Sequence, residues 1–458
     1  MGTVMRSKGM RTNLTIVLSG VFLLISGLVM AQVPQGNRIL AWQVDHAEDG
    51  DFDAAYQIAL STCMESTHLF FTWSSLEPDT GNYNAATIQG YLDIINAYYP
   101  AYGSKADLQF AIINTVAKEM PSELEELPLN HPIVISRLKT ALDTIFNHIP
   151  DLELNSLNIG NESDIFFGDS PEQYQQLGAL LDSVAPYAQE KYFALHQEPL
   201  KIGTTFTLEG LTHEPTATPC ALVNNTRDLI TTTYYPLTNG FEMASPDVVF
   251  EDFDALTTQY QEVEIHFAEC GYSTSELCNS NEQQQADFYS NVFTAWDNHI
   301  DQIKYISFFK TTDWGQAQIE EFIDYYNIID PAFAAYLGTL GVRTWEGSSS
   351  PKMAWDRIIC ELESRDWCNQ PCVVNVEENT GLHSKLFPNP AQNNFTIELM
   401  DAEPTNIIVR DASGRIQANI QTKGSYSTTL SCNDWAPGMY FVTVLKDTKV
   451  DQLSLVVN

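Results

Sequence analysis

Hydrophobic and polar residues follow two patterns over residues 38–366. Short apolar runs of strand length are separated by longer segments in which apolar residues recur every three to four positions. We expect eight strands, at residues 38–45, 68–73, 108–114, 154–160, 200–206, 228–235, 263–269 and 304–310. We expect helices in most of the intervening segments, including residues 51–67, 84–99, 131–149, 170–195 and 281–300.

This order of strands and helices predicts an α/β fold. Helical connections let successive strands run parallel, and eight such units favour a closed (β/α)8 TIM barrel, assigned to residues 32–366, over an open sheet. The helix after the fifth strand is expected to be reduced or absent, because its segment EPTATPCALVNN is short and rich in proline. Ser170, Pro171 and Glu172 give a helix start signal, with a capping side chain, a first-turn proline and an early acid.

The pattern changes after the barrel segment. Residues 367–384 show neither periodicity and are expected to form a linker. From residue 385 to 458, short alternating segments separated by Asn, Pro, Gly and Asp turns predict a small all-β sandwich of antiparallel strands.

A set of short motifs in this last segment points to secretion. LFPNP, DASGR, APGMYFVTV and a terminal LSLVV, in that order, resemble the C-terminal sorting domain of the Bacteroidetes type IX secretion system. The resemblance implies passage across the outer membrane and an interaction with that secretion machinery. Judged on shape alone, a carbohydrate-binding or structural sandwich is the alternative.

The first 31 residues have the layout of a secretory signal peptide. Arg6, Lys8 and Arg11 precede an apolar stretch that ends in small residues, with cleavage expected after Ala31. The alternative is a single membrane anchor, since the apolar run approaches the length that spans a bilayer. No later segment has the character of a membrane span, so the mature protein is expected to be secreted or to lie at the cell surface.

The net charge of the chain restricts its possible binding partners. Removing the signal segment, which holds three basic residues and no acidic ones, changes the formal net charge from −36 to −39. A surface of this sign repels phosphate backbones and anionic lipid. The sequence therefore argues against nucleic acid and anionic membranes as partners.

All eight cysteines follow the signal segment and enter a compartment where disulfides persist. Cys270 with Cys278, and a pair drawn from Cys360, Cys368 and Cys372, are close enough in sequence to close short loops, but spacing leaves the connectivity open. A zinc site at Cys368 and Cys372 is the weaker interpretation because no second matching pair follows.

Two glutamates occupy positions at which closed barrels place their active-site residues. Glu162 follows the fourth strand in IGNE, and Glu269 ends the seventh in HFAECGYSTSE. The residues just beyond parallel strands converge on one mouth of such a barrel. Retaining glycoside hydrolysis needs two carboxyl groups there, one protonated and one ionised. The sequence therefore predicts that Glu162 and Glu269 are catalytic residues.

The arrangement resembles clan A glycoside hydrolases over residues 38–366. In that clan an Asn-Glu pair ends strand four and a Glu ends strand seven. The resemblance implies that Glu162 is the acid/base, that Asn161 binds the sugar hydroxyl beside the scissile bond, and that Glu269 is the nucleophile. Within the clan, IGNE, TTTYYPL and AECGYST are loosely similar to the endo-β-1,4-galactanase family.

Further side chains are candidates for binding substrate. Sugar rings pack their C–H faces on aromatic side chains, so the aromatic residues that follow strands are expected to line a saccharide cleft, with core packing as the alternative. The candidates are Trp73, Trp314, Tyr235 as a hydrogen-bond donor to the nucleophile, Asp45 and His213. A lone histidine is more often structural.

Other kinds of chemistry find no support in the sequence. HExxH, GxSxG and a phosphate-cradling glycine loop after a strand are all missing, so we expect no cofactor and no metal. Strand three lacks the His or Asp signature of galactanases, and strand two lacks the arginine that many clan members place near the nucleophile. A non-catalytic barrel that binds glycans or serves as a scaffold is therefore the alternative function.

The seventh strand contains a conflict. Strict alternation places Glu269, Phe267 and Ile265 on one face, which leaves His266 and Glu264 toward the helix layer. Burial of a histidine and a glutamate there is unfavourable. We therefore expect either a β-bulge near the strand end or a later strand start.

Overall fold

The computed structural model describes residues 33–368, 372, 384–399, 405–411, 415–422, 425–446 and 449–457. The predicted signal peptide and most of the predicted linker lie outside these residues. Within them, no helix is both long and apolar enough to cross a membrane.

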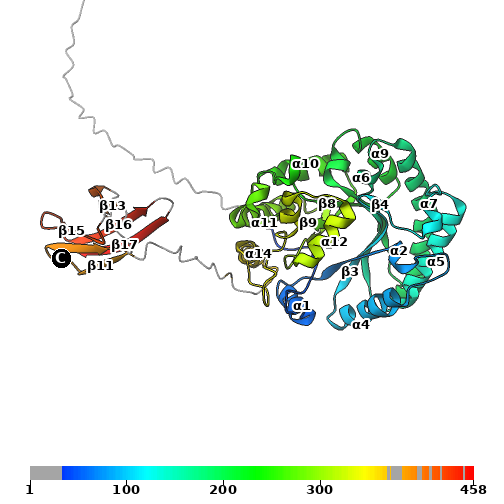
Figure 1. Ribbon diagram of the computed structural model, residues 1–458, viewed down its shortest axis with the longest axis horizontal. Helices are drawn as coiled ribbons and strands as arrows, with labels where there is room; N and C mark the ends of the chain where they lie inside the picture. The colour runs from blue at the N-terminus through cyan, green and yellow to red at the C-terminus, as the bar shows by residue number, and fades with distance from the viewer. Residues whose placement is uncertain are drawn as a thin grey trace, which may run out of the picture.

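A ring of parallel strands forms the centre of the first domain and helices surround it (Figure 1). The strands are β1 (Ile39–Trp42), β2 (Ser66–Thr72), β3 (Lys105–Asn114), β5 (Leu154–Asn161), β6 (Lys201–Gly203), β7 (Thr205–Thr207), β8 (Leu229–Tyr234), β9 (Glu264–Cys270) and β10 (Ile303–Phe308). A short strand, β4 (Ala117–Lys118), pairs antiparallel with β3. All eight strands expected from the sequence are present, and the α/β barrel is confirmed.

The fifth predicted strand is divided at Thr204. Its first half, β6, pairs with β5, and its second half, β7, pairs with β8, so this stretch of chain completes the ring. The close approach depends on Gly203, where a Cβ atom would lie 2.7 Å from the Thr231 hydroxyl and 2.9 Å from Asn158 Oδ1. A larger residue at this position would force the barrel wall apart.

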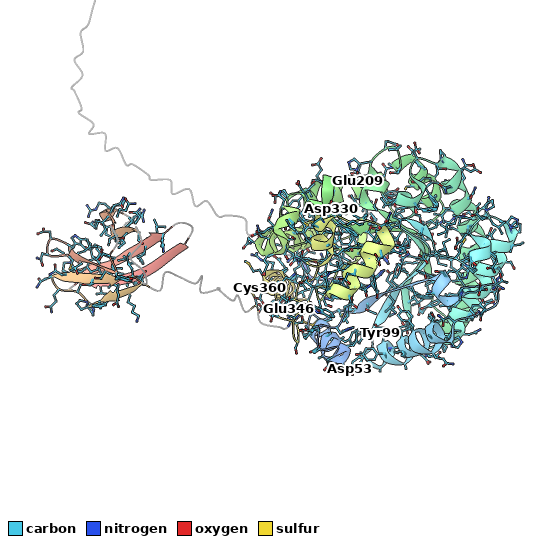
Figure 2. The ribbon with its side chains drawn as sticks, viewed as in Figure 1. Asp53, Tyr99, Glu209, Asp330, Glu346 and Cys360 are labelled. Atoms are coloured by element: carbon cyan, nitrogen blue, oxygen red, sulfur yellow. A yellow bond between two sulfur atoms is a disulfide. The ribbon has the colours of Figure 1, made fainter. Side chains whose placement is uncertain are left out.

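Helices form the outer layer. They are α1 (Phe52–Leu60), α2 (Trp73–Leu76), α3 (Ala85–Thr87), α4 (Asp93–Ala101), α5 (Pro132–His148), α6 (Ser163–Phe167), α7 (Pro171–His196), α8 (Leu208–Thr212), α9 (Ala217–Asn224), α10 (Val248–Gln259), α11 (Glu282–Asn298), α12 (Gln316–Tyr326), α13 (Pro331–Leu337) and α14 (Met353–Ser364). Helix α7 begins at Pro171 as predicted, although the Ser170 side chain makes no capping hydrogen bond. The connection after the fifth strand holds only the short helices α8 and α9, as the proline-rich segment predicted. Figure 2 shows the side chains that fill the space between these layers.

Two disulfides join the end of the barrel to earlier elements. Cys63 pairs with Cys368 across 305 residues, and Cys360 on α14, labelled in Figure 2, pairs with Cys372. Cys270 and Cys278, one of the pairs that spacing allowed, do not form a bridge, because both thiols are free and buried. The zinc interpretation also fails, because both of its cysteines are oxidised.

The barrel also extends further than the sequence indicated. Trp367, assigned to the linker, packs its ring against Trp296 with centroids 5.1 Å apart, and the guanidinium of Arg38 lies 4.8 Å from the Trp367 ring. With the disulfide at Cys368, these contacts place both residues in the barrel rather than in a linker.

The C-terminal segment forms two antiparallel sheets, as expected. One contains β11 (Lys385–Phe387), β12 (Asn394–Glu398) and β15 (Ser427–Ser431), and the other β14 (Ile416–Gln421), β13 (Asn406–Asp411), β16 (Gly438–Lys446) and β17 (Lys449–Val457). Inward residues of both sheets share one apolar core, which includes Phe395, Ile397, Val409, Val442 and Leu455. This packing is that of a β-sandwich.

Candidate active site

One cavity of about 760 Å³ opens where the barrel strands end, a size typical of small-ligand sites. Glu162 and Glu269 both line it. Much of the remaining lining is aromatic and comes from the segment after β10 together with α12 and α13: Phe309, Trp314, Phe322, Tyr326, Phe333 and Tyr336.

The chain turns sharply at the end of β5, where Glu162 follows the last strand residue. Gly160 has a φ of +95°, a conformation that side chains rarely adopt, and a Cβ atom there would lie 2.9 Å from Ser163 Oγ. Glu162 itself is left-handed, with φ 45° and ψ 41°, and helix α6 begins at the next residue. Strained backbone of this kind is typical of functional sites. The abrupt step from an apolar strand to an amide and a carboxylate therefore serves to direct Glu162 into the cavity.

Two threonine hydroxyls hold the carboxyl group of Glu162. Thr115, just after β3, donates to Oε2 at 2.8 Å, and Thr233 on β8 donates to Oε1 at 2.8 Å. Because the donors come from different strands, they fix the orientation of the carboxyl group in two directions.

Of the two alternatives expected for the seventh strand, a β-bulge or a later start, the structure shows the β-bulge. On β9, Phe267 pairs with Thr232 and Glu269 pairs with Thr233, so Ala268 is an extra residue that has no counterpart on β8. Before the bulge, His266 faces the barrel interior and contacts Ser156 Oγ at 3.2 Å. The extra residue shifts the alternation by one position and turns Glu269 inward as well.

Glu269 is more deeply buried than an ordinary carboxylate. Its side chain is 14% exposed, and the hydroxyl of Tyr235 donates to Oε2 at 2.6 Å, as predicted for this tyrosine. Burial raises the pKa of Glu269 to about 7 from its usual 4.5. The nearby His68 and the Tyr235 hydroxyl act to lower this pKa, and Glu162 acts to raise it.

Thr233 links the two carboxyl groups. It is the Cα partner of Glu269 in the β8–β9 ladder, and its hydroxyl donates to Glu162. The two acids therefore lie at the same end of the barrel, and the charge of Glu162 acts to raise the pKa of Glu269.

Three of the predicted substrate-binding residues besides Tyr235 line the cavity: Asn161, Trp314 and the exposed His213. Asn161 donates from Nδ2 to Asn114 Oδ1 at 3.1 Å, and its own Oδ1 is buried with no hydrogen-bond partner among the described residues. Trp314 packs against Phe322 with ring centroids 4.5 Å apart. Asn161 Oδ1 is therefore free to accept a hydrogen bond from a ligand hydroxyl.

The structure does not bring Trp73 and Asp45 into the cavity. Trp73 is fully buried and its indole N–H donates to Glu77 at 3.0 Å, so it packs in the core. Asp45 forms an ion pair with the buried ammonium group of Lys310, which lies 3.9 Å from the Trp314 ring centroid.

The sequence alone did not identify Thr115, Thr233 and His68. Alternation along β2 and β8 would have placed His68 and Thr233 inside the barrel, but nothing in the pattern indicated which acid each would contact. Among the described residues, no cluster of three or more His, Cys, Asp or Glu side chains is arranged to hold a metal ion.

Comparison with known proteins identifies the C-terminal domain. Residues 385–458 match the family described as "Secretion system C-terminal sorting domain". This confirms the resemblance seen in the LFPNP and APGMYFVTV motifs. A search of curated proteins found no match.

Solved structures match the barrel. The exo-β-1,4-mannosidase of Opitutaceae bacterium strain TAV5 gives a TM-score of 0.54 at 14% identity, over 73% of this chain and 61% of that protein, so the match leaves over a third of the mannosidase uncovered. A GH5_18 protein of Bifidobacterium longum subsp. longum, in complex with Manb1-4GlcNAc, gives 0.53 at 13% identity, over 73% and 80% of the two chains. A GH5_18 protein of Bifidobacterium longum subsp. infantis gives 0.53 at 12% identity, again over 73% and 80%.

At these identities the likeness establishes the fold. The sorting domain, in turn, marks the protein for the cell surface or the exterior. The chain combines a barrel with the fold of clan A glycoside hydrolases and a C-terminal sorting domain of the type IX secretion system.

Proposed function

We propose that the protein is a retaining glycoside hydrolase that cleaves a polysaccharide or oligosaccharide, with Glu162 as the acid/base and Glu269 as the nucleophile. The observation that carries the proposal is the position of the two carboxyl groups in one cavity. They are oriented by separate donors and joined through Thr233.

The reaction takes place in two displacements. In the first, the Glu269 carboxylate attacks the anomeric carbon while Glu162 gives its proton to the departing glycosidic oxygen. A glycosyl ester on Glu269 results. In the second, Glu162 takes a proton from water, whose oxygen attacks the anomeric carbon and releases Glu269. The sugar leaves with its original anomeric configuration.

The walls of the cavity suggest the class of glycan. Acidic side chains line it at Glu209 and Asp252 as well as at the two catalytic positions, and no lysine or arginine is among the described lining residues. Glu209 extends from α8 and is labelled in Figure 2. Proteins that bind sugar carboxylates or sulfates usually offer Arg or Lys to them. We therefore expect the substrate to be an uncharged glycan that stacks on Trp314.

The proposal is tested by hydrolysis of a panel of neutral and uronate-containing glycans. Wild type is compared with Glu269→Gln and with Glu190→Gln, which removes an exposed carboxylate on α7. Glu269→Gln should lose at least about a hundredfold in rate, and Glu190→Gln should match wild type. Equal rates in wild type and Glu269→Gln would reject the assignment. A wild type that binds glycans and cleaves none would favour the alternative of a binding protein.

A further inference from the structure

A buried histidine on β2 faces the proposed nucleophile. The His68 side chain is 1% exposed, and its Nε2 lies 3.9 Å from Glu269 Oε1. Its other ring nitrogen, Nδ1, lies 2.8 Å from Asp107 Oδ2. Nε2 has no hydrogen-bond partner among the described residues, so the imidazole is held on one side only and is directed at Glu269 on the other.

Asp107 on β3 determines that Nδ1 of His68 carries a proton. Its side chain is fully buried, and its Oδ1 accepts hydrogen bonds from Ser156 Oγ and from Asn158 Nδ2, the latter at 2.8 Å. Three donors therefore converge on two carboxyl oxygens. A carboxylate accepts from all of them, so Nδ1 of His68 is the donor in its contact with Asp107.

The proton on Nε2 follows from what it faces. Without a proton, the Nε2 lone pair would point at a carboxylate oxygen, and two acceptors would face each other in a buried space. With a proton, an N–H group faces Glu269. Other titratable side chains border this pair. Tyr235 of the segment after β8 donates to Glu269 at 2.6 Å, Glu162 acts on Glu269 through its charge, and His266 of β9 is reached through Ser156 and lies 2.7 Å from Glu264.

The electrostatic balance agrees with this arrangement. Burial lowers the pKa of His68, but the hydrogen bond and negative charge of Asp107, together with the charge of Glu269, outweigh burial and raise that pKa above its usual value. The protonated ring lies between two carboxylates, one on β3 and one on β9.

We propose that His68 is a positioning residue, which stays protonated and favours the ionised, attacking form of Glu269 against the effect of burial, while Asp107 keeps the imidazole in place. The inference rests on the proposed function, in which Glu269 is the nucleophile. His68 neither gives nor takes a proton in either displacement. When the glycosyl ester forms and Glu269 loses its charge, Asp107 still balances the imidazolium.

The first test is the pH profile of hydrolysis. Removing the imidazolium leaves only the Tyr235 hydroxyl to offset burial, so His68→Gln and Asp107→Asn should both move the acid limb of kcat/KM upward by about one pH unit or more. Their rates should fall about tenfold further below wild type at pH 6 than at pH 8. His148→Gln is the matched control, because His148 forms a similar 2.7 Å contact with Asp93 on the surface and should leave the profile unchanged.

The second test needs no substrate and no variant of His68. Imidazole-labelled full-length protein is titrated by NMR, as wild type and as Glu269→Gln. Among the described residues His68 is the histidine paired with Glu269, so the signal that differs between the two proteins identifies it. The pKa of this ring should lie above the usual value of a histidine in wild type and should fall in Glu269→Gln.

The outcomes separate the two hypotheses. A neutral His68 between pH 6 and 8, or an unchanged acid limb in folded His68→Gln, overturns the positioning role while hydrolysis still supports the proposed function. A charged His68 in a protein that cleaves no glycan rejects the proposed function and, with it, the positioning role.

Discussion

The barrel and the C-terminal sandwich bury different kinds of side chain. The sandwich core is built from residues such as Phe395, Val409 and Val442, and in its described part no Asp, Glu, Lys or Arg is buried. The barrel interior buries Asp107 and Lys310 completely, beside a much larger apolar core.

This difference distinguishes side chains that are buried to stabilise the fold from side chains that are buried to take part in chemistry. Removing a charge from water costs several kcal/mol unless partners offset it, so a domain that only needs to fold has no reason to bury one. Asp107 contacts His68, which faces Glu269, and Lys310 lies against Trp314, so both of these charges are close to the cavity. Other buried charges serve the fold: Arg38 and Arg365 form ion pairs with Asp297 away from the cavity lining. The buried charges close to the cavity are thus the strongest physical sign of where its function lies.

The largest expected effect comes from the acid/base. Glu162→Gln should lower the rate on natural glycosides by about 10²–10⁴-fold, because the departing oxygen then receives no proton. On an aryl glycoside with an acidic leaving group the loss in the first displacement should be far smaller, since that group departs unaided. Equal losses on both substrates, measured by initial rates, would remove Glu162 from this role.

A smaller effect should follow from changing one threonine in each domain. Thr233→Val removes a donor to Glu162 and should reduce kcat/KM by about tenfold or more. Thr396→Val removes an exposed hydroxyl pair with Thr429 in the sandwich and should leave kcat/KM within about twofold. If the two variants gave similar activities, Thr233 would have no part in orienting Glu162.

Stability should change with pH in a way specific to the barrel. The pKa of Glu269 is raised to about 7 in the folded protein from 4.5, so the folded state favours the protonated form. That stabilisation is complete below about pH 4.5 and is lost as pH rises through 7. Glu269→Gln carries no charge, so calorimetry should show its Tm rising by about 2–4 °C more over wild type at pH 8 than at pH 5. A gain that is the same at both pH values would contradict the raised pKa.

The smallest effect is expected from removing the sandwich. The two domains have separate apolar cores, so a chain ending at residue 384 should keep the barrel's kcat/KM within about twofold. Export of that shorter chain should fail, which secretion assays would detect. A loss of hydrolysis in the purified barrel would show that the sandwich contributes to the site.

The sequence predicted most of what local pattern controls. Strand positions followed from short apolar runs. The bulge on β9 was one of two alternatives indicated by strict alternation, which placed His266 on the face opposite Glu269, toward the helix layer. The pattern did not predict contacts that depend on three-dimensional convergence. Cys63 and Cys368 are 305 residues apart, and Thr115 reaches Glu162 from a different strand. Asp45 follows a strand, as substrate-binding residues of barrels do. It forms an ion pair instead, with Lys310, which lies 265 positions later in the chain.

The most direct test of the account is to trap the glycosyl ester. Wild type is incubated with a slow fluorinated sugar that forms the first intermediate and hydrolyses slowly, and its peptides are then weighed. We predict a mass increase of one fluorinated sugar on the peptide that contains Glu269, absent in Glu269→Gln. A label on another residue, or hydrolysis with inverted configuration and no label, would contradict the assignment of Glu269 as the nucleophile.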